Sequence, residues 1–343
     1  MRVLVTGHNG YVGTIMMPML VNAGYDVVGL DTDLYEGSTF GNESIKHDFP
    51  ELRKDIRDIE ASDLKGIDAI IHLAGLSNDP LSDLDPGLTF EINHKASVRM
   101  AQLAKKVGVE RFIFSSSCSN YGAGGQDWLD ENSTLNPITP YGTSKVLVEQ
   151  EVSKLADAHF SPTFLRSSTA YGVSPRLRFD LVLNNLVAWA YTTGQVLLKS
   201  DGTAWRPIVH VQDMSLAFLS ALNASRDTVH NEAFNVGRTE ENYRIRDLAK
   251  IVAETVPGSR IEYSQGAEPD KRNYRVLCNK IARTLPDFKP RWTAREGAKE
   301  LYEAYKKIGV RQEEFEGPRF KRIDVIKLLL STGRLDKTLR WKK

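Results

Sequence analysis

A tyrosine and a lysine four residues apart, Tyr141 and Lys145 in "YGTSK", are the side chains best suited to acid–base chemistry. On a helix, residues at positions i and i+4 lie on the same face. A free tyrosine has a pKa of about 10 and is a poor base at neutral pH, but a neighbouring ammonium group stabilises its phenolate. The pair predicts a general base that removes a proton from a hydroxyl group.

The stretch "SSSCSNYG" (115–122) follows the apolar run "RFIF" directly. Ligands of open parallel sheets bind at the carboxyl ends of the strands, so the hydroxyls of this stretch are expected to face a bound molecule. Ser117 would hydrogen-bond the same substrate hydroxyl as Tyr141. A Tyr-x-x-x-Lys spacing is common by chance, and the serine-rich strand end favours the catalytic interpretation.

The segment "TGHNGYVG" places Gly7, Gly10 and Gly13 three residues apart, after an expected strand (2–5) and at the start of an expected helix (11–24). Glycines in such a loop allow a tight turn and let the backbone approach a pyrophosphate at the helix N-terminus. Turns need glycine for other reasons too, so the spacing alone is weak evidence. Its position between a strand and a helix indicates a dinucleotide site.

Asp31 ends the next expected strand, 18 residues beyond Gly13. An acidic side chain there can accept both hydroxyls of the adenosine ribose and would repel a 2′-phosphate. The adjoining residues in "GLDTDLY" include no arginine or lysine, so the sequence predicts NAD rather than NADP. Asp55, in "RKDIRD", either contacts the adenine amine or is ordinary solvated surface.

Apolar strands alternate with helices of 12–20 residues along the first half of the chain. This order predicts an α/β fold, a Rossmann-type doubly wound parallel sheet with helices on both faces. Continuous apolar strands such as "AIIHLA" suit a sheet that is buried on both sides. The expected strands are 2–5, 26–31, 69–74, 111–117 and 161–168, and the expected helices are 11–24, 88–108 and 141–158.

The pattern changes after about residue 171, where a smaller, mainly α C-terminal substrate lobe is expected. Residues 196–211 read as a hairpin built on Asp201-Gly202, and the amphipathic segment 322–341 as a helix packed on the protein body rather than on a partner. The expected division is a Rossmann domain (1–171 with parts of 205–240), a substrate lobe (172–204 and 241–320) and a C-terminal helical tail (321–343).

Composition excludes several classes of function. The formal net charge is +1, with 41% hydrophobic and 26% charged residues, which gives no reason to expect nucleic acid or a membrane surface as partner. Cys118 and Cys278 are the two cysteines and form no metal-ligand or disulfide pattern. No apolar run approaches the roughly 18 residues of a membrane span. A cytoplasmic protein without a metal is expected.

Five motifs in order resemble the extended short-chain dehydrogenase/reductase family: "TGHNGYVG", "HLAG" (72–75), "SSSCSNYG", "YGTSK" and "WRPIVHVQDM". Within it, the chain is most similar to the NAD-dependent nucleotide-sugar epimerase/dehydratase group, over about residues 1–310. The resemblance implies a Rossmann domain with a small substrate lobe, tightly held NAD and a nucleotide-diphosphate sugar as substrate. It also implies a homodimer formed by two helices per subunit, one of them the Tyr141 helix.

The resemblance also assigns site residues by position. Ser117, Tyr141 and Lys145 would be catalytic. Arg206 and Arg272 would grip the substrate diphosphate, for which the fork of a guanidinium is well shaped. The remaining cofactor residues would be Gly7, Gly10, Tyr11, Val12, Gly13, Asp31, Asp55, Ile56, Leu73, Ala74, Gly75, Asn93, Ser115 and Ser168, together with Tyr141 and Lys145. The remaining substrate residues would be Ser77, Cys118, Ser119, Thr169, Arg176 and Asn185, the last equally readable as an ordinary helix residue.

Three departures from the group's pattern bear on the reaction. Dehydratases and decarboxylases of the group carry acidic residues just after the catalytic Ser/Thr, whereas this chain has Cys118 and Ser119. Cys118 would be either an inert pocket residue or a weak acid with a shifted pKa. Thr169 stands where the group often has an asparagine that contacts the diphosphate.

The sequence therefore predicts an NAD-dependent nucleotide-sugar epimerase, most simply a 4-epimerase acting through a transient 4-keto intermediate. The alternatives are a nucleotide-sugar 4-dehydrogenase, or less readily a dehydratase, of the same family. A non-catalytic NAD-binding sensor is a third possibility, which the intact Ser117–Tyr141–Lys145 set argues against.

Overall fold

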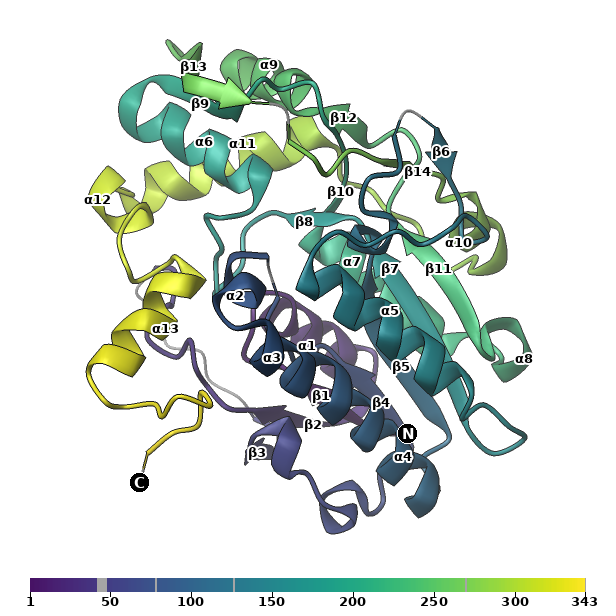
Figure 1. Cartoon of the computed structure of the whole chain (residues 1–343). Helices are drawn as coiled ribbons and strands as arrows, with labels where there is room; N and C mark the ends of the chain where they lie inside the picture. Colours follow the sequence, from purple (N-terminus) through teal and green to yellow (C-terminus); the bar gives the residue numbers. More distant parts are fainter. Residues whose placement is uncertain (42–47, 78, 126, 269, 343) are drawn as a thin grey trace.

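The structure is a computed structural model that describes residues 1–41, 48–77, 79–125, 127–268 and 270–342. Its centre is a seven-stranded parallel sheet in the order β11-β7-β5-β4-β1-β2-β3 (Figure 1). The Rossmann-type sheet that the sequence predicts is confirmed. Its strands are β1 (Arg2–Thr6), β2 (Asp26–Asp31), β3 (Glu51–Arg53), β4 (Ala69–His72), β5 (Arg111–Ser117), β7 (Ser161–Ser167) and β11 (Glu232–Val236).

Both faces of this sheet are covered by helices, so alternate residues of one strand enter two different cores. In β1, Val3 and Val5 pack with α1 (Gly13–Asn22) and α7 (Val211–Asn223), while Leu4 packs on the opposite face with α4 (Ala96–Val107) and α5 (Pro140–Ser153). This double burial explains why the strands are almost continuously apolar. It also fixes the carboxyl ends of the strands on one common edge.

The sheet domain is completed by short elements. They are η1 (Ile56–Asp58), η2 (Ala61–Leu64), α2 (Asp79–Leu84), α3 (Pro86–Thr89), the π-helical turn η3 (Phe90–Lys95), η4 (Cys118–Tyr121) and α8 (Arg226–Val229). The single helix expected over 88–108 is thus α3, η3 and α4 in direct succession, with Gly108 ending it at φ 87°.

A second, smaller part lies above the carboxyl edge of the sheet (Figure 1). The third hydrophobic core of the protein lies here and joins four helices and one two-stranded sheet. The elements are α6 (Val182–Thr193), β9 (Gln195–Ser200), α9 (Ile245–Thr255), β13 (Arg260–Glu268), α11 (Ala294–Ile308) and α12 (Gln312–Phe315). Smaller pairings connect the two parts through β8 (Thr169–Tyr171), β10 (Trp205–His210), β12 (Asn242–Arg244), β6 (Trp128–Leu129), β14 (Arg275–Val276) and α10 (Asn279–Thr284).

The expectation of a hairpin over 196–211 is wrong. The turn at Asp201-Gly202 exists, with Gly202 at φ 75° and the Asp201 carboxylate accepting a bond from the Thr203 amide at 2.9 Å. The two strands then part, because β9 pairs with β13 whereas β10 pairs with β8 and β12. A turn motif specifies a reversal of the chain, and the partner of each strand is decided elsewhere.

The C-terminal segment turns back onto the sheet domain rather than joining the second part. It consists of α13 (Arg322–Ser331) and a turn that is closed by a bridge between Leu335 and Trp341. The helical tail is therefore shorter than expected, and it packs on the protein body as predicted (Figure 1).

No helix among the described residues is long and apolar enough to cross a membrane.

Candidate active site

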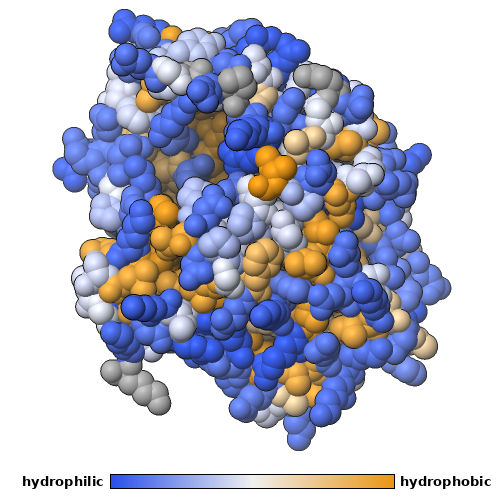
Figure 2. All heavy atoms as spheres, in the orientation of Figure 1, coloured by the Kyte–Doolittle hydropathy of each residue, from blue (hydrophilic) through white to orange (hydrophobic). Residues whose placement is uncertain are grey.

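A cavity of about 1130 Å³ lies between the sheet domain and the second part. It opens as the hollow above the centre of the molecule in Figure 2. Ligand pockets for drug-sized molecules occupy roughly 300–1,000 Å³, so this cavity can hold a dinucleotide and a second ligand together. Of the 25 different site residues expected from the sequence, all but Asn93, Cys118 and Arg176 line it.

The glycine loop forms one end of the cavity and has no room for side chains. A Cβ added to Gly13 would lie 2.4 Å from the His8 carbonyl oxygen, and one added to Gly7 would lie 2.9 Å from the Ala74 amide nitrogen. Gly7 also has φ 74°, a conformation that side chains disfavour. The loop therefore brings the N-terminus of α1 against the adjoining "HLAG" backbone, a cradle that fits a dinucleotide pyrophosphate.

Asp31 lies at the end of β2 with its carboxylate on the cavity wall. It accepts hydrogen bonds from the amides of Asn9 (3.1 Å) and Asp33 (3.0 Å), while burial raises its pKa. Basic residues do approach from β3, but Arg53 pairs with Asp33 at 3.4 Å and Lys54 with Asp63 at 2.7 Å. Because both cations already pair with carboxylates, neither is free to bind a 2′-phosphate. The site therefore suits the ribose hydroxyls of NAD better than the 2′-phosphate of NADP.

Asp55 also lines the cavity, but Arg57 engages its carboxylate. Asp55 caps η1 by accepting the Arg57 amide at 2.8 Å, and the Arg57 guanidinium donates to both of its oxygens. Burial acts to raise the pKa of Asp55, and these bonds outweigh it and lower that pKa. The predicted adenine contact would have to share this carboxylate with Arg57.

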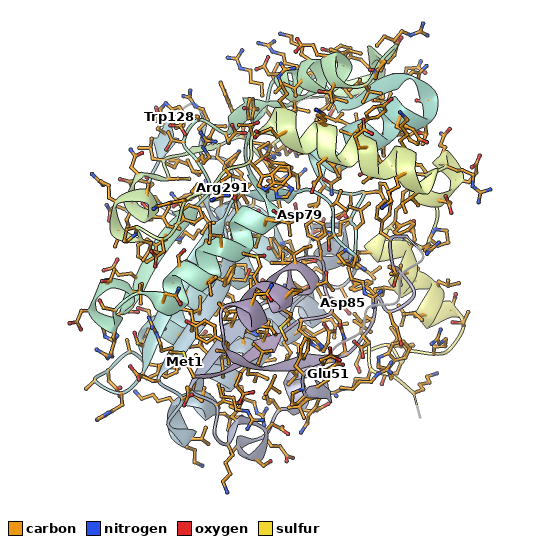
Figure 3. The ribbon with its side chains drawn as sticks, turned by 180° about the vertical axis from the view of Figure 1, so that it is seen from behind. Met1, Glu51, Asp79, Asp85, Trp128 and Arg291 are labelled. Carbon is orange, nitrogen blue, oxygen red and sulfur yellow. The ribbon has the colours of Figure 1, made fainter. Side chains whose placement is uncertain are left out.

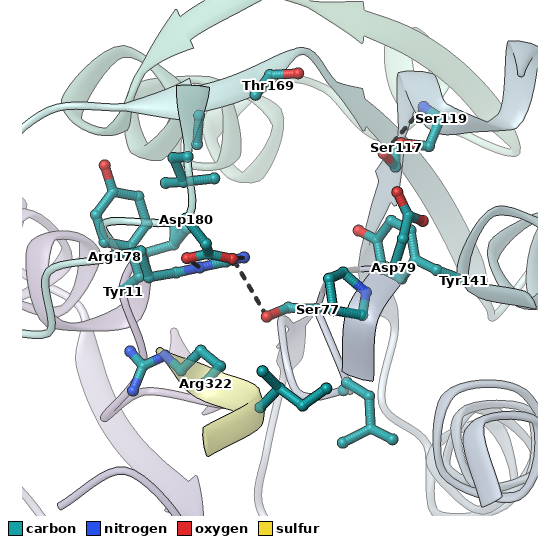
Figure 4. Close-up of a pocket in the computed structure, with 18 of the residues that line it drawn as sticks. Tyr11, Ser77, Asp79, Ser117, Ser119, Tyr141, Thr169, Arg178, Asp180 and Arg322 are labelled. Atoms are coloured by element: carbon teal, nitrogen blue, oxygen red, sulfur yellow. Dashed lines mark hydrogen bonds and ion pairs between the residues drawn. The ribbon is translucent and has the colours of Figure 1, made fainter. Parts of the chain in front are cut away.

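The expected catalytic side chains meet where β5 ends beside α5. Ser117 closes β5 and caps η4 by accepting the Ser119 amide at 3.1 Å. Thr139 caps α5, so that Tyr141 and Lys145 fall on the helix face that looks into the cavity. Figure 4 shows Ser117, Tyr141 and Asp79 gathered on one wall of the cavity.

Burial opposes ionisation of both members of the Tyr-Lys pair. It raises the pKa of Tyr141 to about 12, against the lowering effect of the Ser117 hydroxyl and the Arg178 guanidinium. It lowers the pKa of Lys145 to about 8. The Lys145 ammonium lies 5.7 Å from the Tyr141 ring centroid and donates to the Ser115 carbonyl at 2.8 Å. The site thus holds a buried cation next to a phenol.

Lys145 itself is held by a buried network. Glu149, one turn further along α5, raises the pKa of Lys145 against the larger effect of burial, and forms an ion pair with Arg166 at 2.7 Å. On the other side, burial and Lys145 lower the pKa of His72 to about 3, so this imidazole is neutral. Neutral His72 bonds Thr6 and Ser97, which ties β1, β4 and α4 together behind the site.

The two arginines expected to hold a diphosphate also line the cavity, and both are already paired with carboxylates. Arg206 contacts Asp270 at 2.7 Å, and Arg272 contacts Asp270 at 2.8 Å and Asp79 at 2.5 Å. Asp79 comes from α2 of the sheet domain and lies near the centre of the molecule when seen from behind (Figure 3). Its second oxygen, Oδ1, is buried without a hydrogen-bond partner among the described residues. A ligand that binds the two arginines must compete with Asp79 and Asp270.

Sequence reasoning missed many polar residues of the cavity wall, among them Arg178, Asp180 and Arg322. Arg178 forms a two-pronged ion pair with Asp180 at 2.6 and 3.1 Å and donates to Ser77 at 3.2 Å (Figure 4). The pattern that could have revealed Arg178 and Asp180 is "RLRFD" (176–180), in which an arginine is followed two residues later by an aspartate. Arg322 lies too far along the chain for any local pattern to place it.

Three expected site residues do not reach the cavity, and these assignments are corrected. Cys118 turns away as η4 begins, and its thiol contacts the Arg166 carbonyl at 3.1 Å in the core, where burial raises its pKa to about 12. Arg176 donates to the Asn9 and Glu36 carbonyls instead of facing a ligand. Asn93 bonds both backbone groups of Leu76 and so supports the cavity wall from behind.

The other expected residues have mixed surroundings. Asn185 lines the cavity while donating to the Phe179 carbonyl at 2.9 Å. Ser168 lines the cavity, and a hydrogen bond with its hydroxyl lowers the pKa of the Cys118 thiol against the larger effect of burial. The described residues contain no cluster of three or more His, Cys, Asp or Glu that could hold a metal.

Comparison with known proteins defines the class to which this fold and site belong. Residues 3–237, more than half of the chain, match the NAD dependent epimerase/dehydratase family. The chain belongs to this family and is an NAD-dependent enzyme of the extended short-chain dehydrogenase/reductase type. The dinucleotide expected from the glycine loop is thus confirmed as NAD, and the residues of the cradle fit it.

Individual relatives are moderately similar. The UDP-glucose 4-epimerase of Bacillus subtilis (strain 168) is 29% identical over 288 residues, which cover 77% of this chain and 84% of that protein. The structure of MoeE5 in complex with UDP-glucose and NAD is 27% identical, with a TM-score of 0.76, and covers 90% of this chain and 99% of that one. The UDP-glucose 4-epimerase of Thermotoga maritima has a TM-score of 0.78 at 24% identity, covering 90% and 99%, and shows the shared fold.

Proposed function

We propose that the protein is a nucleotide-sugar 4-epimerase that inverts C4 of a hexose through a transient 4-keto intermediate. The observation that carries this proposal is the convergence of Ser117, Tyr141 and Lys145 at the carboxyl end of β5, in one cavity with the NAD cradle. The similarity to relatives named UDP-glucose 4-epimerase supports a uridine diphosphate hexose as substrate.

Each residue of the catalytic set has a part in proton transfer. Tyr141 takes the proton from the sugar 4-hydroxyl and later returns it, and Ser117 hydrogen-bonds the same oxygen. Lys145, a cation that cannot leave its buried position beside the ring, favours the phenolate form of Tyr141. When bound in the glycine-loop cradle, NAD would supply the acceptor and donor of the C4 hydride and a positive charge near the phenol.

The substrate diphosphate is assigned to the wall that carries Arg206 and Arg272. Its charge would replace Asp270 and Asp79 as partner of the two guanidiniums, since phosphate oxygens accept the same forked bonds. The exchange would free Asp79 next to Tyr141, where a carboxylate can accept hydrogen bonds from sugar hydroxyls. The diphosphate would stay bound to the two arginines while the ketosugar rotates and presents its opposite face to the nicotinamide.

The competing reactions of the family differ in their products. Neither Cys118 nor Ser119 is acidic, and Cys118 is buried away from the cavity, which leaves this strand end without the proton donor expected of a dehydratase. A 4-dehydrogenase would share the whole catalytic set. It would have to release NADH at each turnover.

The test is an incubation of the purified protein with UDP-, dTDP-, GDP- and CDP-hexoses, followed by chromatography with mass detection and absorbance of NADH. An epimerase yields a new peak of unchanged mass without accumulation of NADH. A product lighter by two hydrogens with rising absorbance would identify a 4-dehydrogenase, and loss of one water a dehydratase. Retention of full activity by Tyr141→Phe would overturn the assignment of the base.

We also propose a homodimer in which α4 and α5 of each subunit form a four-helix contact. The two helices pack together on one outer face of the sheet domain, where His94 and Glu151 approach at 2.6 Å. Light scattering during size-exclusion chromatography tests this state, and a monomer mass would refute it. The cytoplasmic location stays a prediction of the sequence.

A further inference from the structure

Arg322, the first residue of α13, is an unusual buried cation. Its side chain is 2% exposed and lines the cavity from the C-terminal segment. One guanidinium nitrogen, Nη2, donates to the Arg176 carbonyl at 3.1 Å, and the guanidinium stacks on the Tyr35 ring at 3.9 Å from its centroid. The other terminal nitrogen, Nη1, is buried and has no hydrogen-bond partner among the described residues.

The charges around Arg322 are mostly positive, so its guanidinium lacks a counter-ion. Two other arginines, Arg176 and Arg178, are close enough to lower its pKa, and burial is the largest cause that brings this pKa to about 10. Asp180 acts in the opposite direction, but its carboxylate is held by Arg178. No carboxylate in the described part of the chain forms an ion pair with Arg322. A buried cation without a counter-ion is costly, and a bound anion would remove that cost.

The rest of the C-terminal segment reaches the other end of the NAD cradle. The Trp341 indole donates to the Thr32 carbonyl at 2.6 Å, immediately after the ribose-facing Asp31. Arg340 pairs with Asp58, and Leu339 is a further residue of the cavity wall. Residues 322–341, here called the C-terminal strap, therefore run along the segment that follows β2, from Tyr35 at Arg322 to Thr32 at Trp341. In Figure 1 the strap lies alongside these elements.

We propose that the C-terminal strap completes the NAD site, with Arg322 binding the diphosphate of the dinucleotide and residues 339–341 covering its adenosine half. Arg322 supplies the fork of donors that matches two phosphate oxygens. The glycine loop supplies the backbone donors on the opposite side of the same diphosphate.

A nucleotide-sugar diphosphate is the other possible anion, and the surroundings of Arg322 favour the dinucleotide. In Figure 4, Arg322 lies below Tyr11 of the glycine loop and far from Ser117 and Ser119. Its ring partner Tyr35 follows β2, the strand that ends in Asp31. The arginines assigned to the substrate come from β10 and the loop before β14 instead, and they pair with Asp270 and Asp79.

The experiment compares wild type with Arg322→Met and Arg322→Lys, using Arg319→Met as the matched control. Arg319 is an exposed arginine of the preceding turn, so its removal changes the net charge equally without reaching the cavity. NAD carried through purification is quantified per subunit, and its release rate is followed after dilution. Affinities for NAD, ADP-ribose, AMP and UDP are then measured by calorimetry.

Arg322→Met should weaken NAD and ADP-ribose about 10- to 100-fold, the usual effect of losing a charge-assisted hydrogen bond, and should speed NAD release. AMP and UDP should change less than threefold, Arg322→Lys should fall between, and Arg319→Met should match wild type. Equal losses for AMP and ADP-ribose would overturn the diphosphate contact, and so would a loss confined to UDP. If Arg322→Met does not fold, unchanged NAD affinity in Arg322→Lys refutes the forked contact.

Discussion

Replacing Lys145 by methionine should stabilise the NAD-free protein while it abolishes activity. Lys145 is 5% exposed and has no carboxylate within ion-pair distance among the described residues. Burial lowers its pKa from 10.5 to about 8, which corresponds to about 3 kcal/mol against the charged form in the folded state. The lost hydrogen bond to the Ser115 carbonyl offsets about 1 kcal/mol. The free energy of unfolding should therefore rise by about 2 kcal/mol at pH 7.

The difference in stability between Lys145→Met and wild type should depend on pH. Below pH 8 the folded and unfolded chains both carry the Lys145 proton, so wild type bears the whole cost of the buried charge. Between pH 8 and 10.5 the folded chain releases this proton while the unfolded chain keeps it, and wild-type stability rises with pH. The advantage of Lys145→Met should accordingly be largest below pH 8 and shrink as pH approaches 10.5.

Urea unfolding of NAD-stripped protein at several values between pH 6.5 and 9.5 provides the measurement. Lys154→Met, an exposed substitution just beyond the same helix, should change stability by less than about 0.5 kcal/mol at every pH. A Lys145→Met variant that is less stable than wild type at pH 7, or whose advantage does not depend on pH, would refute the reasoning. Confirmation would mean that the site keeps a cation for chemistry at the expense of stability.

Three further substitutions test the site. Tyr141→Phe should lower kcat about 10²- to 10⁴-fold through loss of the general base, while NAD content and thermal stability stay as in wild type; an equal fall in NAD content would point to a binding role. Gly13→Ala should yield protein without NAD and with a lowered Tm, because its Cβ would lie 2.4 Å from the His8 carbonyl oxygen; normal NAD content by extraction would contradict the cradle. Glu149→Gln should cost about 3 kcal/mol in urea unfolding, since it leaves the buried Arg166 without its counter-ion; a change below about 1 kcal/mol would show that the pair is dispensable.

Much of the site could be predicted because its signals are local. The Gly7–Gly13 loop, the acid at the end of β2 and the Tyr141–Lys145 spacing each depend on residues within one strand-turn-helix unit. Their side chains face the cavity because the carboxyl ends of parallel strands share one edge. These are the expected site residues that the structure brings together.

Side-chain direction after a strand end could not be predicted in the same way. Cys118 directly follows Ser117, which lines the cavity, yet the turn into η4 sends its thiol into the core against β7. Arg176 and Arg178 stand two residues apart in a basic turn, and only Arg178 faces the cavity. Side chains alternate every two residues on a strand and every 3.6 residues on a helix, but irregular segments have no such period. There the direction of a side chain is decided by long-range packing.

The sequence by itself determined the parallel sheet, the glycine loop and the approach of Tyr141 and Lys145, because apolar periodicity, glycine spacing and i, i+4 neighbours are properties of short segments. The tertiary structure alone decided how the charged groups of the cavity are paired. Arg272 meets Asp79 across 193 residues, and Arg322 arrives at the glycine loop from the far end of the chain. Such pairings depend on how separate elements pack. The local sequence around either residue does not indicate which distant residue it will meet.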